Sequence, residues 1–147
     1  MIKSSHTVDI DRPSAEVFAF VADQRNEAKW HTDVLDAEPK GPIELGSTVT
    51  WTVKFMGESQ YVCEVTKFDA PNAIRLETRE GPLKPTLTHS FESRNGTTRY
   101  TRTVRIPMEG FFRLVGPIMK VTGAAAKRNA RFAENLKGLL ESSTSRR

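Results

Sequence analysis

The sequence predicts an α+β domain in which a curved antiparallel sheet of seven strands wraps around one long C-terminal helix. Three observations predict it. Apolar and polar residues alternate in successive segments between residues 34 and 106, and short turn signals separate these segments. Two short helical segments precede this pattern, after a first strand. Beyond Pro107, apolar residues instead recur every three or four positions, as on one face of a helix.

The length of the chain, its hydrophobic content and its single cysteine narrow the class of protein. The chain has 147 residues, which is the length of one domain, and 37% of them are hydrophobic. No stretch approaches the ~18 apolar residues of a membrane span. The residues from Met1 to His6 contain no apolar signal-peptide segment, and the single cysteine, Cys63, cannot form an internal disulfide. We therefore expect one cytoplasmic domain over residues 1–147, with about residues 143–147 as a flexible tail.

The first strand is expected over residues 2–10, where Val8 and Ile10 alternate with polar residues. Pro13 suits the first turn of the helix that follows, so that the boundary falls at Asp11 or Arg12. The buried stripe of this helix comprises Val17, Phe18, Phe20 and Val21. Asp23 is the expected cap of a second short helix, which runs through Lys29 and ends at Trp30.

Six further strands are expected over residues 34–38, 48–56, 60–68, 73–80, 86–93 and 97–106. Asn95-Gly96 is the strongest hairpin signal between them, and consecutive hairpins make the sheet antiparallel. The helical pattern after Pro107 comprises Phe111, Leu114, Val115, Ile118, Val121, Ala125, Phe132, Leu136, Leu139 and Leu140, and Gly116-Pro117 should bend it or split off its first turns. One helix cannot fill the concave face of such a sheet. We therefore expect a cavity between sheet and helix, with the two short helices closing part of its rim.

Alternation predicts which side chains face this cavity. A two-residue turn at Asn95-Gly96 pairs Ser93 with Thr98, which places His89 opposite Arg102. The polar groups of the cavity would then be His89, Tyr100 and Arg102, with Tyr61 if its face of the strand points inward. One hypothesis makes His89 a neutral general base, with Arg102 holding a ligand carboxylate or enolate oxygen. In the alternative, Arg102 pairs with an acid such as Glu77 or Glu80, and His89 is a wall residue whose hydrogen bonds are satisfied.

Other residue types in the chain favour structural roles. His6, His31 and Asp33 lack the spacing of metal ligands, so we expect no metal and no other cofactor. Trp30 fills the gap between the second helix and the sheet or, in the alternative, stacks on a ligand. Cys63 has no neighbouring base in sequence and is expected to be a wall or core thiol. The basic run at residues 127–131 is interpreted as a solvated helix face, so nucleic-acid binding is not expected.

Two kinds of segment are candidates for the cavity mouth. Phe111 and Phe112 are adjacent and cannot share one narrow helix face, so one of them lines the mouth, contacts a partner or touches a membrane, unless both rings are buried in a lid. Met119 and Gly116 suit an adaptable entrance. Gly41-Pro42 and Gly81-Pro82 lie at strand ends, where loops gate entry or form ordinary turns.

Four stretches resemble a known family: "DIDRPSAEVFAFVADQRNEAKW", "GSTVTW", "EVTKFDAPNAIRLET" and "GTTRYTRTVRIP". Together they are similar, in order and over nearly the whole chain, to the polyketide cyclase/dehydrase and lipid-transport superfamily, also called START-like or SRPBCC. The resemblance implies the helix-grip fold. The family includes cyclases, dehydratases and lipid carriers and has no universal catalytic motif, so no residue here inherits a role from it.

The function expected from these observations is binding, and with it transport or sequestration, of a hydrophobic small molecule, lipid or polyketide-like. The alternatives are a cyclase or dehydratase that transfers protons without a metal, and a homodimerisation module. His89 and Arg102 are the candidate catalytic residues. The candidate ligand-binding residues are Trp30, Trp51, Val53, Phe55, Leu87, His89, Phe91, Tyr100, Arg102, Val104, Phe111, Phe112, Val115 and Met119.

Overall fold

The computed structural model describes residues 2–41, 43–54, 57–81, 84–107 and 122–142. Strand β1 (Ile2–Ile10) is followed by helix α1 (Ser14–Ala22), the 3₁₀ turn η1 (Gln24–Asn26) and the short helix α2 (Glu27–Trp30). Strands β2 to β7 come next, and helix α4 (Thr122–Ser142) ends the described chain. The strand bounds are Val34–Pro39, Thr48–Lys54, Glu58–Asp69, Ala73–Glu80, Thr86–Arg94 and Thr97–Ile106.

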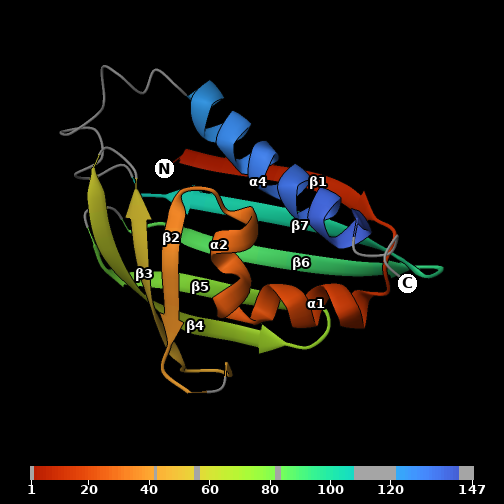
Figure 1. Cartoon of the computed structure of the whole chain (residues 1–147), viewed down its shortest axis with the longest axis horizontal. Coiled ribbons are helices and arrows are strands. Elements are labelled where there is room, and N and C mark those ends of the chain that lie inside the picture. Colours follow the sequence, from red (N-terminus) through yellow and green to blue (C-terminus); the bar gives the residue numbers. More distant parts are fainter. Residues whose placement is uncertain (1, 42, 55–56, 82–83, 108–121, 143–147) are drawn as a thin grey trace.

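The strands form one seven-stranded antiparallel sheet in the order β1-β7-β6-β5-β4-β3-β2 (Figure 1). All strands from β2 to β7 are joined as a meander, and β1 returns beside β7. In the turn between β6 and β7, Asn95 and Gly96 both have positive φ, of 50° and 86°, as a two-residue hairpin turn requires. The predicted pairing of Ser93 with Thr98 is confirmed, and His89 lies opposite Arg102.

The N-terminal helices begin at the expected signals, with one shift. Pro13 has φ −62° but an extended ψ of 148°, so it caps α1 from outside instead of forming its first turn. The expected boundary at Asp11 or Arg12 was therefore early, because only the fixed φ of proline can be read from sequence. Asp23 ends α1 and caps η1 by accepting a hydrogen bond from the backbone N–H of Arg25. Helix α2 follows η1 directly, and its residues Glu27 and Trp30 are buried.

Helix α4 packs against β1, β7 and α2, while α1 packs against β6 and β7 (Figure 1). The helices thus share one face of the sheet, and α4 is the long C-terminal helix that the sequence predicts. The earlier part of that expected helix, with its bend at Gly116-Pro117, lies outside the described residues. None of the helices in the described part of the chain is long and apolar enough to cross a membrane.

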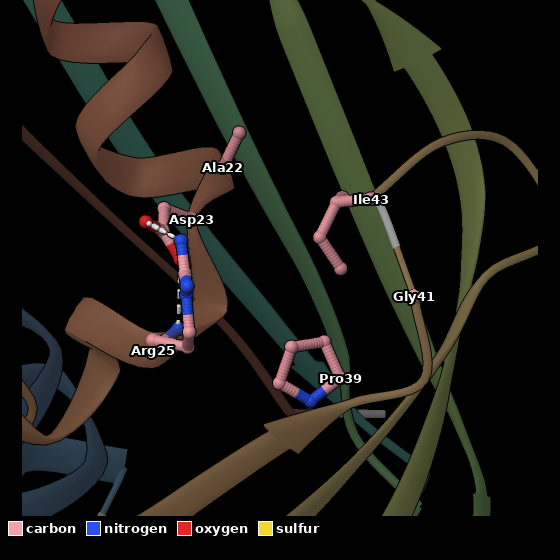
Figure 2. Close-up of a pocket in the computed structure, with 6 residues that line it drawn as sticks. All are labelled: Ala22, Asp23, Arg25, Pro39, Gly41 and Ile43. Carbon is pink, nitrogen blue, oxygen red and sulfur yellow. Dashed lines mark hydrogen bonds and ion pairs between the residues drawn. The ribbon is translucent and has the colours of Figure 1, made fainter.

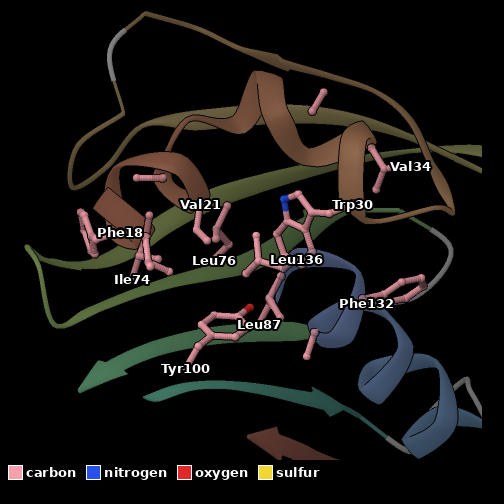
Figure 3. Close-up of a cluster of buried hydrophobic side chains, with 14 of the residues drawn as sticks. Phe18, Val21, Trp30, Val34, Ile74, Leu76, Leu87, Tyr100, Phe132 and Leu136 are labelled. Atoms are coloured by element: carbon pink, nitrogen blue, oxygen red, sulfur yellow. The ribbon is translucent and has the colours of Figure 1, made fainter. Parts of the chain in front are cut away.

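The hydrophobic core lies between the sheet and the helices. Trp30 from α2 and Leu136 from α4 point toward one another there, above Leu87 of β6 and Tyr100 of β7 (Figure 3). Val49, Trp51 and Val53 are buried on β3 while the threonines between them are half-buried, which confirms the predicted alternation. The same core also contains several buried polar and charged side chains, and these define the candidate site.

Candidate functional site

A cluster of polar side chains is buried where α2, β6, β7 and α4 meet. Glu27, His89 and Tyr100 are wholly buried, and Arg102 and His31 are 3% and 9% exposed. Electrostatic interactions link Arg102 to each of the other four side chains. These five residues are called the polar cluster below.

Arg102 is the cation of the polar cluster. Its Nη1 donates to Asn129 Oδ1 at 2.6 Å, and its guanidinium carbon lies 5.9 Å from the ring centre of Trp30 and 5.3 Å from that of Phe132. Its Nε is buried and has no hydrogen-bond partner within the described residues. The buried guanidinium is therefore held by a neutral amide and two aromatic rings.

The expected pairing of Arg102 with Glu77 or Glu80 was wrong. Glu77 forms ion pairs with Arg75 and Arg79, and Glu80 is exposed. On β5 the buried face comprises Ile74, Leu76 and Thr78, so Glu77 points to the opposite side of the sheet.

His89 faces the same interior from β6, directly opposite Arg102. A hydrogen bond of 2.6 Å joins His89 Nδ1 to Tyr100 Oη, while Nε2 is buried without a partner in the described chain. Burial, and then the charge of Arg102, holds the pKa of His89 well below its usual range. The imidazole is therefore neutral at pH 7, and the pKa of Tyr100 is raised by its burial.

Glu27 is the acid of the polar cluster, and sequence reasoning missed it. It lies three residues before Trp30 on α2, so both side chains occupy one face of the helix and turn inward together. Neither carboxyl oxygen has a hydrogen-bond partner within the described residues. Burial raises the pKa of Glu27 to about 8, against the opposing effect of Arg102, so the carboxyl is mostly protonated at neutral pH.

His31 follows α2 and stacks on Phe132 of α4, with the ring centres 3.9 Å apart. Burial lowers its pKa well below the usual range, and Arg102 and Arg128 lower it further. Asp33 forms an ion pair with Arg128. Among the described residues no three His, Cys, Asp or Glu side chains gather as a metal-binding group.

Aromatic and aliphatic side chains surround the polar cluster. Trp30 is wholly buried, and its Nε1 has no partner in the described structure. The Nε1 of Trp51 donates to Gln24 Oε1 at 3.2 Å. Of the other candidate ligand-binding residues, Val53, Leu87 and Phe91 are buried and Val104 is half-buried. Phe55, Phe111, Phe112, Val115 and Met119 lie outside the described residues.

Cys63 is a buried thiol on β4. It lies 3.7 Å from Thr78 Oγ1, and burial raises its pKa to about 11. A thiol with this pKa is not a nucleophile at neutral pH. Its position fits the expected wall or core role.

A separate groove of about 490 Å³ opens at the surface, between the α1–η1 junction and the loop after β2 (Figure 2). Ala22, Asp23 and Arg25 form one side, and Pro39, Gly41 and Ile43 form the other. On the first side of the groove, Arg25 donates two hydrogen bonds of 2.9 Å to the carboxylate of Asp23. The loop that contains Gly41 thus borders a surface recess, and its role as a gate stays a prediction.

The chain matches the sequence profile described as "Polyketide cyclase / dehydrase and lipid transport" over residues 1–141. No curated protein is similar to it in sequence.

Solved structures share the fold at low sequence identity. The protein TTHA0849 from Thermus thermophilus has a TM-score of 0.77 at 16% identity, over 96% of this chain and 98% of that one. A START superfamily protein from Mycobacterium smegmatis has a TM-score of 0.68 at 14% identity, over 95% and 97%. The Zhui aromatase/cyclase from a Streptomyces species has a TM-score of 0.66 at 15% identity, over 90% and 92%. The profile match over nearly the whole length and these shared folds establish that the chain belongs to the polyketide cyclase/dehydrase and lipid-transport family, with a START-like helix-grip fold.

Proposed function

We propose that this protein binds a hydrophobic small molecule, lipid or polyketide-like, between the sheet and α4. The observation that carries the proposal is a set of buried polar atoms, inside an aromatic core, that have no hydrogen-bond partner among the described residues. These atoms are both carboxyl oxygens of Glu27, Nε1 of Trp30, Nδ1 of His31, Nε2 of His89 and Nε of Arg102. Buried polar groups are nearly always hydrogen-bonded, and a ligand with a few polar atoms would supply the partners.

The membership of the family supports this reading, because its description includes lipid transport. The aromatic composition of the interior supports it as well. Trp30, Trp51, Phe91 and Phe132 are rigid apolar surfaces that pack well against a planar or apolar ligand.

Native mass spectrometry of the purified protein tests the proposal, with a titration by the neutral dye Nile red. An apolar adduct or saturable dye binding is expected. Leu87→Phe, which fills the interior, should weaken dye binding, and the matched change Thr88→Phe on the neighbouring half-buried position should not. A protein that carries no adduct and shows no saturable dye binding would contradict the proposal.

A second candidate function is that of a cyclase or dehydratase acting by proton transfer. The observation that favours it is a neutral imidazole at His89 and a protonated carboxyl at Glu27, both interacting with Arg102, since such groups serve as base and acid. With Nδ1–H donated to Tyr100 Oη, His89 Nε2 would be the basic atom. His89→Ala and Arg102→Ala should then abolish turnover of a carbonyl substrate while leaving its affinity intact. Loss of affinity together with turnover would instead favour the binding function.

A further inference from the structure

We propose that the polar cluster selects apolar ligands that carry one anionic oxygen group, a carboxylate or an enolate, and that Arg102 holds this group. The inference deepens the binding function proposed above and rests on it. It names the chemical class of the ligand and the residue that discriminates it.

The first argument is the charge of the interior at neutral pH. The titratable groups that face the polar cluster come from α2, β4, β6, β7 and α4. The pKa of Glu27 is raised, so its carboxyl is mostly neutral. The pKa values of His31 and His89 are lowered, and those of Cys63 and Tyr100 are raised, so these four groups are neutral as well. At the rim, Arg128 is paired with Asp33. Arg102 is thus the one buried group, among those described, whose charge is not matched by a neighbouring ion.

The second argument is the geometry around Arg102. No carboxylate of the described chain lies within ion-pair distance of its guanidinium, whose hydrogen bond to Asn129 is accepted by a neutral amide. Its Nε–H has no acceptor within the described residues. A buried cation is costly unless it is paired and hydrogen-bonded, and an anionic oxygen supplies both. A neutral ligand of the same shape supplies only a weaker hydrogen bond.

The third argument concerns Glu27, whose two oxygens have no hydrogen-bond partner in the described part of the chain and whose carboxyl interacts with Arg102. While it is protonated, it does not compete for the guanidinium. Once ionised, it becomes a second anion beside Arg102 and repels an anionic ligand. The selection of anionic ligands should therefore weaken as the pH rises through the pKa of Glu27, about 8.

The experiment compares two probes of the same shape, 2-naphthoate and its neutral analogue 2-naphthamide. Binding is followed through tryptophan fluorescence, because the two tryptophans of the chain, Trp30 and Trp51, both lie beside the polar cluster. At about pH 7 the wild type should bind 2-naphthoate about tenfold more tightly than 2-naphthamide. Arg102→Met should remove this preference. The matched control Arg105→Met, an exposed arginine on the same strand, should keep it.

A second arm uses pH and does not depend on the folding of the Arg102 variant. Between about pH 7 and about pH 9 the preference of the wild type for 2-naphthoate should fall, while that of Glu27→Gln should stay constant. Saturable binding of both probes with equal affinity would overturn the inference and leave the proposed function standing. A preference that persists in Arg102→Met would also overturn it. If neither probe binds, the proposed function and this inference fail together.

Discussion

Arg102 and Asn129 each donate a hydrogen bond to the other. Arg102 Nη1 donates to Asn129 Oδ1 at 2.6 Å, and Asn129 Nδ2 donates to the carbonyl oxygen of Arg102 at 2.8 Å. The same amide nitrogen lies 3.3 Å from the carbonyl oxygen of Ser4 on β1. One side chain of α4 therefore fixes the helix to two neighbouring strands and orients the buried guanidinium.

Replacement of this amide should destabilise the protein. Asn129→Ala is expected to lower the free energy of unfolding by about 2 to 3 kcal/mol, because it leaves buried donors and acceptors without partners. Urea denaturation measures the loss. Lys127→Ala, at an exposed position of the same helix, should change stability by less than about 0.5 kcal/mol. Equal stability of both variants would show that the Arg102–Asn129 contact contributes nothing net.

Glu27 should make the protein less stable as the pH rises. Its pKa is about 8 in the folded state against an ordinary value of 4.5, so the folded state holds a proton that the unfolded state releases. Its contribution to stability is complete below pH 4.5 and is lost as the pH rises through 8. The loss between about pH 5 and about pH 8 should be on the order of 3 kcal/mol.

Glu27→Gln should remove this dependence, because the amide does not titrate in that range. Urea unfolding at several pH values measures the difference between variant and wild type, and all other groups cancel in that difference. Parallel pH profiles of the two proteins would mean that Glu27 is ionised in the folded state at neutral pH.

His89 should make the protein less stable as the pH falls. Its folded-state pKa lies below the ordinary value of 6.5, so the unfolded state binds the proton first and stability is lost as the pH falls below 6.5. His89→Gln should reduce the slope of the unfolding free energy against pH in this range. His6→Gln changes a partly exposed histidine on β1, in contact with Glu134 of α4, and serves as the matched control. An unchanged slope in His89→Gln would contradict the buried neutral imidazole.

A side chain at Gly81 should destabilise the protein, because it would collide with the ring of Tyr61. A Cβ there would lie 2.5 Å from Cδ2 of the Tyr61 ring, whereas at Gly57 it would meet nothing within 4 Å. Both glycines have positive φ, so Gly81→Ala and Gly57→Ala carry a similar backbone strain and differ mainly in this contact. Gly81→Ala should be less stable by a further 1 to 3 kcal/mol, approximately, measured by thermal or urea unfolding. Equal losses in the two variants would show that Tyr61 moves aside without cost.

The sequence by itself determined the sheet, the two N-terminal helical segments and the long C-terminal helix, because each is encoded in local periodicity and turn chemistry. Asn95-Gly96 sets the β6–β7 register, and with it the position of His89 opposite Arg102. Asp23 caps η1 as expected, since a cap is a contact between near neighbours.

Only the tertiary structure decided how the polar cluster is completed. Asn129 lies within a basic run that was interpreted as a solvated helix face, and yet it is 2% exposed. Glu27 follows a cap and resembles any acid in the first turn of a helix. The burial of both depends on partners distant in sequence, Arg102 above all, and no periodicity of their own segments encodes it. A polar residue enters a core where distant elements supply its environment, so its place becomes known only when helix and sheet are assembled.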